Sequence, residues 1–516
     1  MCYYNEYAIF FVRNYPSFAC STIIVISVAS LHEKSLSKER TNMVFSSITF
    51  LAYFLPLLLG IYFVIPQRFR NLRNLVLLGF SVIFYAWGGV RYLGLLCASI
   101  FINYLGGIFA GGHFQKPVRT IGVICAVAMN LALLGWFKYA GFFAQIINDF
   151  GWSIPVPEII LPIGISFFTF QGLSYVLDVY RGDARTQWNP MNVALYIILF
   201  PQLVAGPIVR YTTVEHEIMN RRESVEEFSQ GVMRFLFGLG KKMLLANTMA
   251  ELADAIFSRS PAHLTTAHAW VGVIAYCFQI YFDFSGYSDM AIGLGRMFGF
   301  HFLENFNYPY IATSITEFWR RWHISLSSFF RDYVYIPLGG NRCSIPRHIC
   351  NIAIVWALTG LWHGAAWTYV AWGIWFGLLL IGEKYLWSGL LQRIPRGIAH
   401  IYTMLAVLLG WVLFRSASIS SALTYIATMF GCGRGALWSK AFIFYLKQYG
   451  VYFLACILGS MPTAPTVAKY LRSRNGSRVC RAVLTWGPKL FALALLILSY
   501  IKLATGSFNP FIYFQF

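Results

Sequence analysis

A single histidine lies inside a nearly uncharged apolar run, residues 358–367, with the sequence LTGLWHGAAW. Ionisable groups in such runs are costly in a membrane and are candidates for function. A neutral imidazole at His363 can remove a proton from an attacking hydroxyl, and Gly360 and Gly364 allow another group to approach the backbone closely. The alternative is a histidine that only satisfies a hydrogen bond between helices. His363 is therefore a candidate general base.

A second histidine follows two arginines in the segment 317–327, with the sequence EFWRRWHISLS. On a continuous helix, Trp319 and His323 share a face at spacing i, i+4, and Arg320 lies three residues before the histidine. Arginines on an aromatic-rich segment suit an interfacial helix that holds the phosphates of a coenzyme or a lipid headgroup. For the arginines alone, an anchor on anionic membrane lipid is the simpler interpretation.

A third polar stretch, QIYFDFSGYSD at 279–289, ends an apolar run. Asp283, Asp289 and two serines lie among aromatic residues, and Gly286 permits a tight backbone. This pattern predicts a helix break that lines a cavity, because irregular backbone inside a membrane is tolerated only there. A hydrogen-bond cluster between helices is the structural alternative.

The composition indicates the elements that position these residues. The chain has 516 residues, of which 58% are apolar and 12% charged, with a mean hydropathy of +0.59. Soluble proteins carry roughly 45–50% apolar and about 25% charged residues, so a soluble globule, a disordered chain and a disulfide scaffold fit poorly. The net charge of +20 indicates that lysine and arginine are concentrated in short loops beside a membrane. No nucleic-acid partner is expected.

Apolar runs long enough to cross a bilayer recur along the chain from Phe45 onward. They predict an all-α, polytopic membrane protein with about 11–13 transmembrane helices, joined by loops too short for a soluble domain. The ten cysteines are scattered without a Cys-x-x-Cys pair, so neither a metal site nor a disulfide framework is predicted. Motifs of serine hydrolases, ATP-driven pumps and zinc proteases are missing from the sequence.

The first 42 residues differ from the rest of the chain. A short apolar run at 18–29 precedes the charged stretch 32–40, and its length resembles the core of a signal peptide. The simpler interpretation is an extension upstream of a true start at Met43. We therefore expect an N-terminal extension over 1–42 and one transmembrane domain over 43–516.

Seven blocks in order resemble the membrane-bound O-acyltransferase family, and most of all its bacterial branch of alginate O-acetyltransferase membrane subunits. The blocks are MVFSSITFLAYFLPLLLGIYF (43–63), PIGISFFTFQGLSYVLDVYRGD (162–183), FPQLVAGPIVR (200–210), FQIYFDFSGYSDMAIGLGRMFGF (278–300), FWRRWHISLSSFFRDYVYIPLGGNR (318–342), GLWHGAAWTYVAWG (360–373) and NPFIYFQF (509–516).

The resemblance implies a multi-pass enzyme of the bacterial inner membrane that O-acetylates an exopolysaccharide such as alginate. Its two characteristic positions fall on His323 and His363, which are expected to be catalytic. The resemblance implies no bound cofactor and no metal, with acetyl-CoA from the cytoplasm as the donor substrate. It also implies a periplasmic partner resembling SGNH hydrolases, other exopolysaccharide export or modification subunits, and membrane lipid. The expected substrate-binding residues are Asp283, Glu317, Arg320, Arg321 and Trp362.

Two other classes of protein remain open on the sequence. A transporter or flippase for a polysaccharide or lipid precursor would also use broken helices and intramembrane carboxylates such as Asp283 and Asp289, although no inverted repeat is visible. A scaffold subunit of an export complex is the other class, and in it neither histidine would affect acetylation.

Overall fold

The computed structural model describes residues 43–260, 264–433, 435–473 and 478–506. The expected extension over 1–42 and the block at 509–516 lie outside the described residues, so the division into 1–42 and 43–516 stays a prediction. The chain divides into two compact units, Met1–Gly94 and Leu95–Phe516. All the candidate site residues belong to the second unit.

The first unit is built on aromatic packing. Phe45 lies 5.0 Å from Phe50, and Phe54 lies 5.7 Å from Phe84, between ring centroids. The second of these contacts joins its first helix to its last long one. Its described helices are η1 (Thr49–Phe54), α3 (Leu55–Val64), α4 (Arg70–Gly89) and η2 (Val90–Tyr92).

The second unit holds the other helices, and α5 (Leu93–Ala110) begins at the boundary. Before the site residues come α6 (Lys116–Leu134), η3 (Gly135–Tyr139), α7 (Ala140–Asp149), α8 (Ile165–Arg181), α9 (Pro190–Ile198), α10 (Phe200–Leu203), α11 (Tyr211–Asn220), α12 (Val225–Gly240), η4 (Lys241–Ala246) and α13 (Asn247–Phe257). The rest are α14 (Thr266–Met297), η6 (Pro309–Ile311), α15 (Ile315–Arg321), α16 (Ile324–Phe330), η7 (Arg331–Tyr335), α17 (Ile345–His363), α18 (Trp367–Tyr385), α19 (Ser388–Arg393), α20 (Arg396–Arg415), α21 (Ile419–Met429), α22 (Lys440–Gly459), α23 (Thr463–Ser473) and α24 (Arg478–Ala504).

The predicted all-α membrane class is confirmed, since the described residues form helices and no strand. Among the described residues, five helical segments are long and apolar enough to cross a membrane, whereas the apolar runs of the sequence predict about 11–13. Other runs form shorter helices such as α8, or carry polar residues as α14 does. The five are Arg70–Ala110, Lys116–Asp149, Arg396–Arg415, Lys440–Gly459 and Val479–Ala504.

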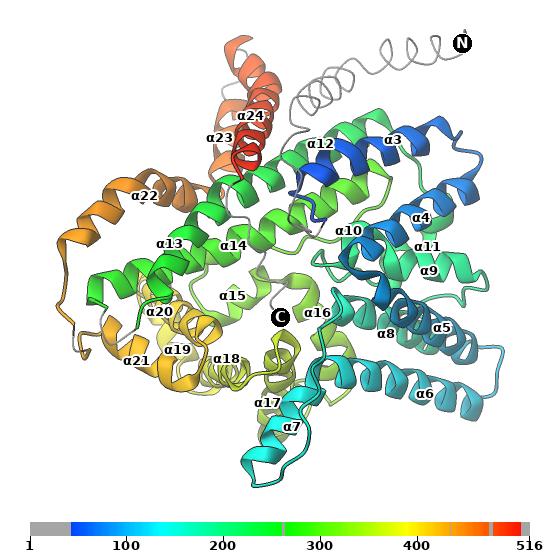
Figure 1. Ribbon diagram of the computed structural model, residues 1–516, viewed down its shortest axis with the longest axis horizontal. Coiled ribbons are helices and arrows are strands. Elements are labelled where there is room, and N and C mark those ends of the chain that lie inside the picture. Colours follow the sequence, from blue (N-terminus) through cyan, green and yellow to red (C-terminus); the bar gives the residue numbers. More distant parts are fainter. Residues whose placement is uncertain (1–42, 261–263, 434, 474–477, 507–516) are drawn as a thin grey trace. The chain divides into compact units, whose positions relative to one another are not determined.

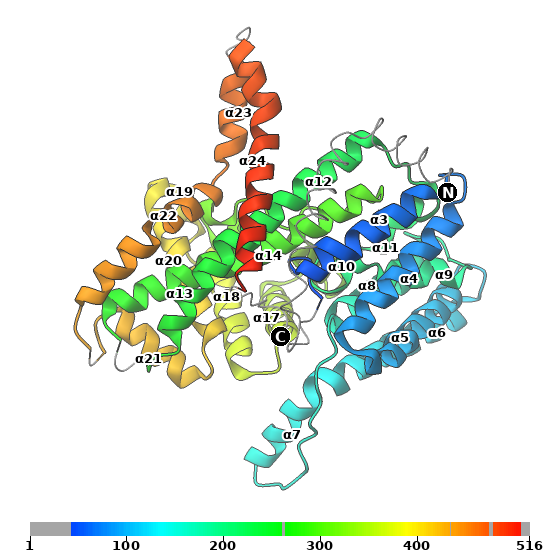
Figure 2. The same ribbon diagram turned by 45° about the horizontal axis from the view of Figure 1, so that its top comes forward.

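Helices α12 and α14 run side by side (Figures 1 and 2) because glycines let their backbones touch. A Cβ at Gly286 would lie 2.8 Å from the carbonyl oxygen of Gly238, and one at Gly231 would lie 2.6 Å from that of Gly293. Small residues serve this purpose where membrane helices pack closely. The helix break predicted at 279–289 is therefore wrong: α14 continues through Gly286, which is a contact point between helices.

Helices α17 and α18 also cross at close range. A Cβ at Gly373 would lie 2.4 Å from the carbonyl oxygen of Trp356, and one at Gly360 would lie 2.4 Å from that of Tyr369. This crossing holds the end of α17, and with it His363, against the aromatic residues of α18 and α20.

Candidate active site

His323 lies between two short helices and is fully buried. Helix α15 ends at Arg321, and His323 has φ 43° and ψ 54°, the left-handed region that few residues other than glycine adopt. The expectation that Trp319 and His323 share one helix face is therefore wrong, because the helix breaks between them. Trp319 instead packs on Trp356 and Phe376.

The His323 ring is held by Asn305, which lies in the loop after α14. Nδ1 of the histidine lies 3.0 Å from Oδ1 of Asn305. The same oxygen accepts hydrogen bonds from the backbone N–H and the hydroxyl of Ser325, at 3.2 and 2.9 Å. Nδ2 of Asn305 donates to the hydroxyl of Ser288 on α14. With Oδ1 as the acceptor, the neutral imidazole carries its hydrogen on Nδ1 and leaves a lone pair on Nε2.

Aromatic rings connect the two histidines. Trp362 lies 5.8 Å from His323 and 5.0 Å from His363, between ring centroids. His363 also meets Trp372 at 4.9 Å, and His323 meets Phe284 at 4.6 Å. The structure thus brings the two predicted catalytic residues and Trp362 together from two segments of the chain, the turn at His323 and the end of α17.

Each imidazole has a buried nitrogen without a partner. Nε2 of His323 and Nδ1 of His363 have no hydrogen bond to any residue that the structure describes. Buried polar atoms are nearly always hydrogen-bonded, so such atoms need an explanation. Nitrogens that receive a proton or a substrate hydroxyl during a reaction provide one.

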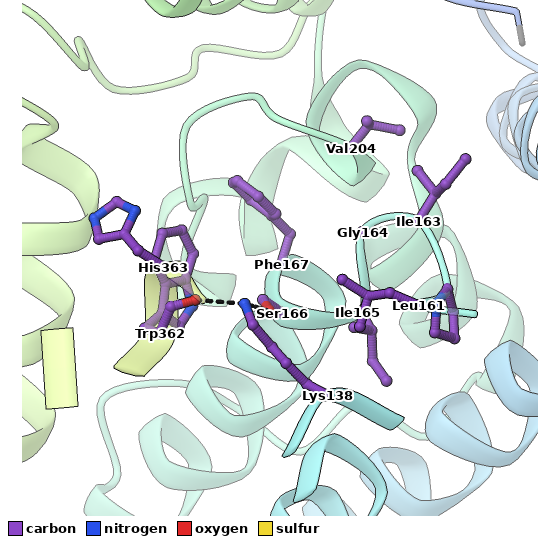
Figure 3. Close-up of a pocket in the computed structure, with 11 residues that line it drawn as sticks. Lys138, Leu161, Ile163, Gly164, Ile165, Ser166, Phe167, Val204, Trp362 and His363 are labelled. Carbon is purple, nitrogen blue, oxygen red and sulfur yellow. Dashed lines mark hydrogen bonds between the residues drawn. The ribbon is translucent and has the colours of Figure 1, made fainter. Parts of the chain in front are cut away.

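A small cavity of about 40 Å³, room for about one water molecule, lies beside His363 (Figure 3). Its wall includes Lys138, Ser166 and Trp362. Nζ of Lys138 donates hydrogen bonds to the carbonyl oxygen of Trp362 and to the hydroxyl of Ser166, the latter at 3.1 Å.

A second cavity, of about 940 Å³, reaches the residues that hold His323. Asn305, Ser288 and Ile324 form part of its wall, and its size suits a cofactor-sized ligand. Four cationic side chains and two carboxylates line it as well: Arg234, Lys241, Arg296, Lys489, Asp289 and Glu304.

The predicted aspartate of α14 is in an ion pair. Asp283 lies 2.6 Å from Nζ of Lys242, and both side chains are 2% exposed. Asp289, one and a half turns further along α14, is paired with Lys241 and Arg234, at 2.6 and 2.7 Å. The carboxylates of α14 thus neutralise cations of α12 and η4.

The predicted residues of α15 lie apart from both cavities. Glu317 accepts hydrogen bonds from Thr313 and from Arg321 four residues later. Although burial raises the pKa of Glu317, these hydrogen bonds hold it below its usual value, so the carboxylate is ionised and ties Thr313 and Arg321 to its own helix. The side chain of Arg320 is exposed. In the described part of the chain, no group of three metal-ligating side chains comes together.

Two residues of the site were missed in the sequence. Asn305 stands in a loop, and nothing in its neighbourhood marks it out. Lys138 had a signal, because it is the one charged residue between Arg119 and Asp149, and a lone charge in an apolar run is a candidate for function.

These features define a class. A helical membrane protein that holds two buried imidazoles with unpartnered nitrogens close to cavities has the features of an integral membrane enzyme.

Comparison with known proteins gives the family. Residues 179–396 match the membrane-bound O-acyltransferase family. The chain is 41% identical over 508 residues to the probable alginate O-acetylase AlgI of Azotobacter vinelandii, covering 92% of this chain and 100% of that protein. It is 40% identical over 532 residues to the protein of the same name in Pseudomonas aeruginosa, with the same coverage. It is 32% identical over 516 residues to the peptidoglycan O-acetyltransferase of Helicobacter pylori, covering 92% and 98%. The chain belongs to the membrane-bound O-acyltransferase family and is a membrane O-acyltransferase.

Proposed function

We propose that this enzyme takes acetyl groups from acetyl-CoA at the cytoplasmic face of a bacterial inner membrane and passes them across for O-acetylation of an exopolysaccharide such as alginate. The observation that carries the proposal is the pair of unpartnered imidazole nitrogens, on His323 and His363, with the ring of Trp362 between them. The relatives named as alginate and peptidoglycan O-acetyltransferases support the acetyl group and a polysaccharide as its destination.

In the proposed step, a hydroxyl oxygen attacks the thioester carbonyl carbon. His363 removes the hydroxyl proton as the new C–O bond forms. The tetrahedral intermediate then collapses, the C–S bond breaks, and the thiolate takes the proton from His363. His323 presents Nε2 as a hydrogen-bond acceptor, because Asn305 fixes the hydrogen on Nδ1.

The second cavity is the proposed entrance of the donor. It ends at Asn305 and Ser288, beside His323, and Arg234, Lys241, Arg296 and Lys489 supply cations for the phosphates of a coenzyme. This replaces the expectation that Arg320 and Arg321 hold the donor, since neither lines the cavity.

The acceptor side is proposed to need a partner. A periplasmic protein resembling SGNH hydrolases would carry the acetyl group to the polymer, alongside other exopolysaccharide export or modification subunits. We propose that no cofactor stays bound, since acetyl-CoA enters as a substrate.

The flippase alternative rested on broken helices and on intramembrane carboxylates at Asp283 and Asp289. In the structure α14 is continuous, and both carboxylates are paired with cations.

The test uses membrane vesicles that contain the enzyme and its partner, supplied with acetyl-CoA carrying a radioactive acetyl group. Inside-out vesicles are expected to transfer label to the partner or polymer, and right-side-out vesicles are expected not to. The His363→Ala enzyme is the control for transfer that does not depend on this chain. Label from right-side-out vesicles alone would refute cytoplasmic donor entry. No label from either kind, with an active enzyme in cells, would refute acetyl-CoA as donor.

A further inference from the structure

The end of α17, which carries His363, is held from outside by two successive residues of one other helix. The last four carbonyl groups of a helix have no partner within it. Here the hydroxyl of Tyr139 donates to the carbonyl oxygen of Leu361 at 2.8 Å, and Nζ of Lys138 donates to that of Trp362. A cation is also favourable at the negative end of a helix dipole.

Both contacts come from the π-helical turn η3. Lys138 and Tyr139 close this turn, Gly135–Tyr139, between α6 and α7. Such turns are rare, and are found mostly as single-turn bulges at functional sites. Both side chains reach carbonyl groups in the last turn of α17.

The contacts of Lys138 continue to the site itself. Besides the Trp362 carbonyl it meets the hydroxyl of Ser166 on α8, and its Nζ lies 5.8 Å from the centre of the Trp362 ring. Figure 3 shows the amine beside the backbone carbonyl of Trp362, while the His363 ring projects to the other side. Lys138 therefore touches Trp362, whose ring lies between the two histidines, and its hydrogen bond to the Trp362 carbonyl connects it to the backbone that carries His363.

We propose that Lys138 is a positioning residue of the acyl transfer, which fixes the end of α17 so that His363 and Trp362 face His323. The proposal rests on the proposed function of the two histidines. Loss of the amine frees the Trp362 carbonyl and lets the end of α17 shift, and a displacement of about 1 Å at a reacting group can cost about 100-fold in rate.

The experiment compares Lys138→Met, which keeps the length of the side chain without its donors, with Lys138→Arg, which keeps the donors and the charge. Lys116→Met is the matched control, because Lys116 is an exposed lysine at the start of α6. Each full-length enzyme is assayed in vesicles with labelled acetyl-CoA, and its thermal unfolding midpoint is measured after extraction in detergent.

We expect Lys138→Met to lower kcat by about 10- to 100-fold with KM for acetyl-CoA changed less than about twofold. Lys138→Arg is expected to recover a substantial part of kcat, Lys116→Met to match the wild type, and all midpoints to agree. An unchanged kcat in Lys138→Met overturns the proposal. A raised KM at normal kcat overturns it as well. A third contrary result is a loss of kcat in both Lys138→Met and Lys138→Arg together with a lowered unfolding midpoint, because that indicates a damaged fold.

A failure of the proposal that acetyl-CoA is the donor can be distinguished from a failure of the proposed role of Lys138. If wild-type vesicles do not use acetyl-CoA, the same variants are compared by the ester content of polymer from producing cells, per amount of enzyme in the membrane. Equal ester content in Lys138→Met and wild-type cells then overturns the role of Lys138, and a loss restored by Lys138→Arg supports it.

Discussion

At His323 the backbone adopts a left-handed conformation, which costs about 1–2 kcal/mol for a residue with a Cβ. The surroundings impose it: the N–H of Ile324 donates to the Asn305 carbonyl at 2.9 Å, while the Asn305 side chain meets Nδ1 of His323. Asparagine tolerates this conformation better than alanine does. We expect His323→Ala to lower acetylation about 100-fold or more, and His323→Asn to retain a measurable part of it.

The measurement is the ester content of the polymer beside the amount of enzyme in the membrane. His323→Gly is the control, because glycine relieves the backbone cost without supplying a hydrogen-bonding group. Equal and complete loss in the asparagine and alanine variants would contradict an orienting role and assign proton transfer to His323.

Both histidines were recognisable in the sequence as ionisable residues among apolar ones, but their surroundings were not. The run Trp-Arg-Arg-Trp-His has no glycine or proline to mark a break, so its pattern predicts one helix. At the break, Asn305, which is 18 residues away in the chain, accepts hydrogen bonds from the residues that follow Trp322. A contact between residues so far apart in the chain leaves no pattern in the sequence around His323.

At the scale of helices, α12 and α14 depend on backbone contact. Gly286→Ala would place a Cβ 2.8 Å from the Gly238 carbonyl oxygen and 3.1 Å from the N–H nitrogen of Lys242. These are backbone atoms that cannot turn aside, so we expect a loss of about 1–3 kcal/mol in stability. The matched control is Gly450→Ala in α22, where a Cβ meets nothing within 4 Å and higher helix propensity favours alanine.

The two variants are compared by their thermal unfolding midpoints in detergent. We expect the Gly286→Ala midpoint to fall and the Gly450→Ala midpoint to rise or stay the same. A Gly286→Ala midpoint at or above that of the wild type would contradict the close packing. The structural role of Gly286 could not be predicted from the sequence, because glycine occurs both in helix breaks and in close contacts between helices. The position of the neighbouring helix α12 distinguishes the two roles.

At the scale of the whole molecule, the +20 charge predicts how the chain lies in its membrane. Lys241 and Lys242 are paired with Asp289 and Asp283, so these two lysines do not belong to the excess positive charge. The remaining basic clusters should lie in the cytoplasm, above all Arg320–Arg342 and Lys469–Arg481, although 474–477 lies outside the described residues.

Single cysteines at Asn341 and Ser473, both exposed, test this orientation with an impermeant thiol reagent on intact cells. The background must lack the native cysteines, since Cys97, Cys125, Cys350 and Cys432 are exposed. We expect Asn341→Cys and Ser473→Cys to be protected until the membrane is opened. Labelling of Asn341→Cys from outside would reverse the orientation and with it the proposed path of the acetyl group.

The central claim is that His363 takes part in acyl transfer, and the ester content of polymer from His363→Ala cells tests it most directly. One imidazole contributes about 10²–10⁴-fold as a general base but little to the stability of a large helical protein. We therefore expect the ester to fall to background while immunoblots show a normal amount of enzyme in the membrane. Normal ester content in the His363→Ala cells would contradict the account.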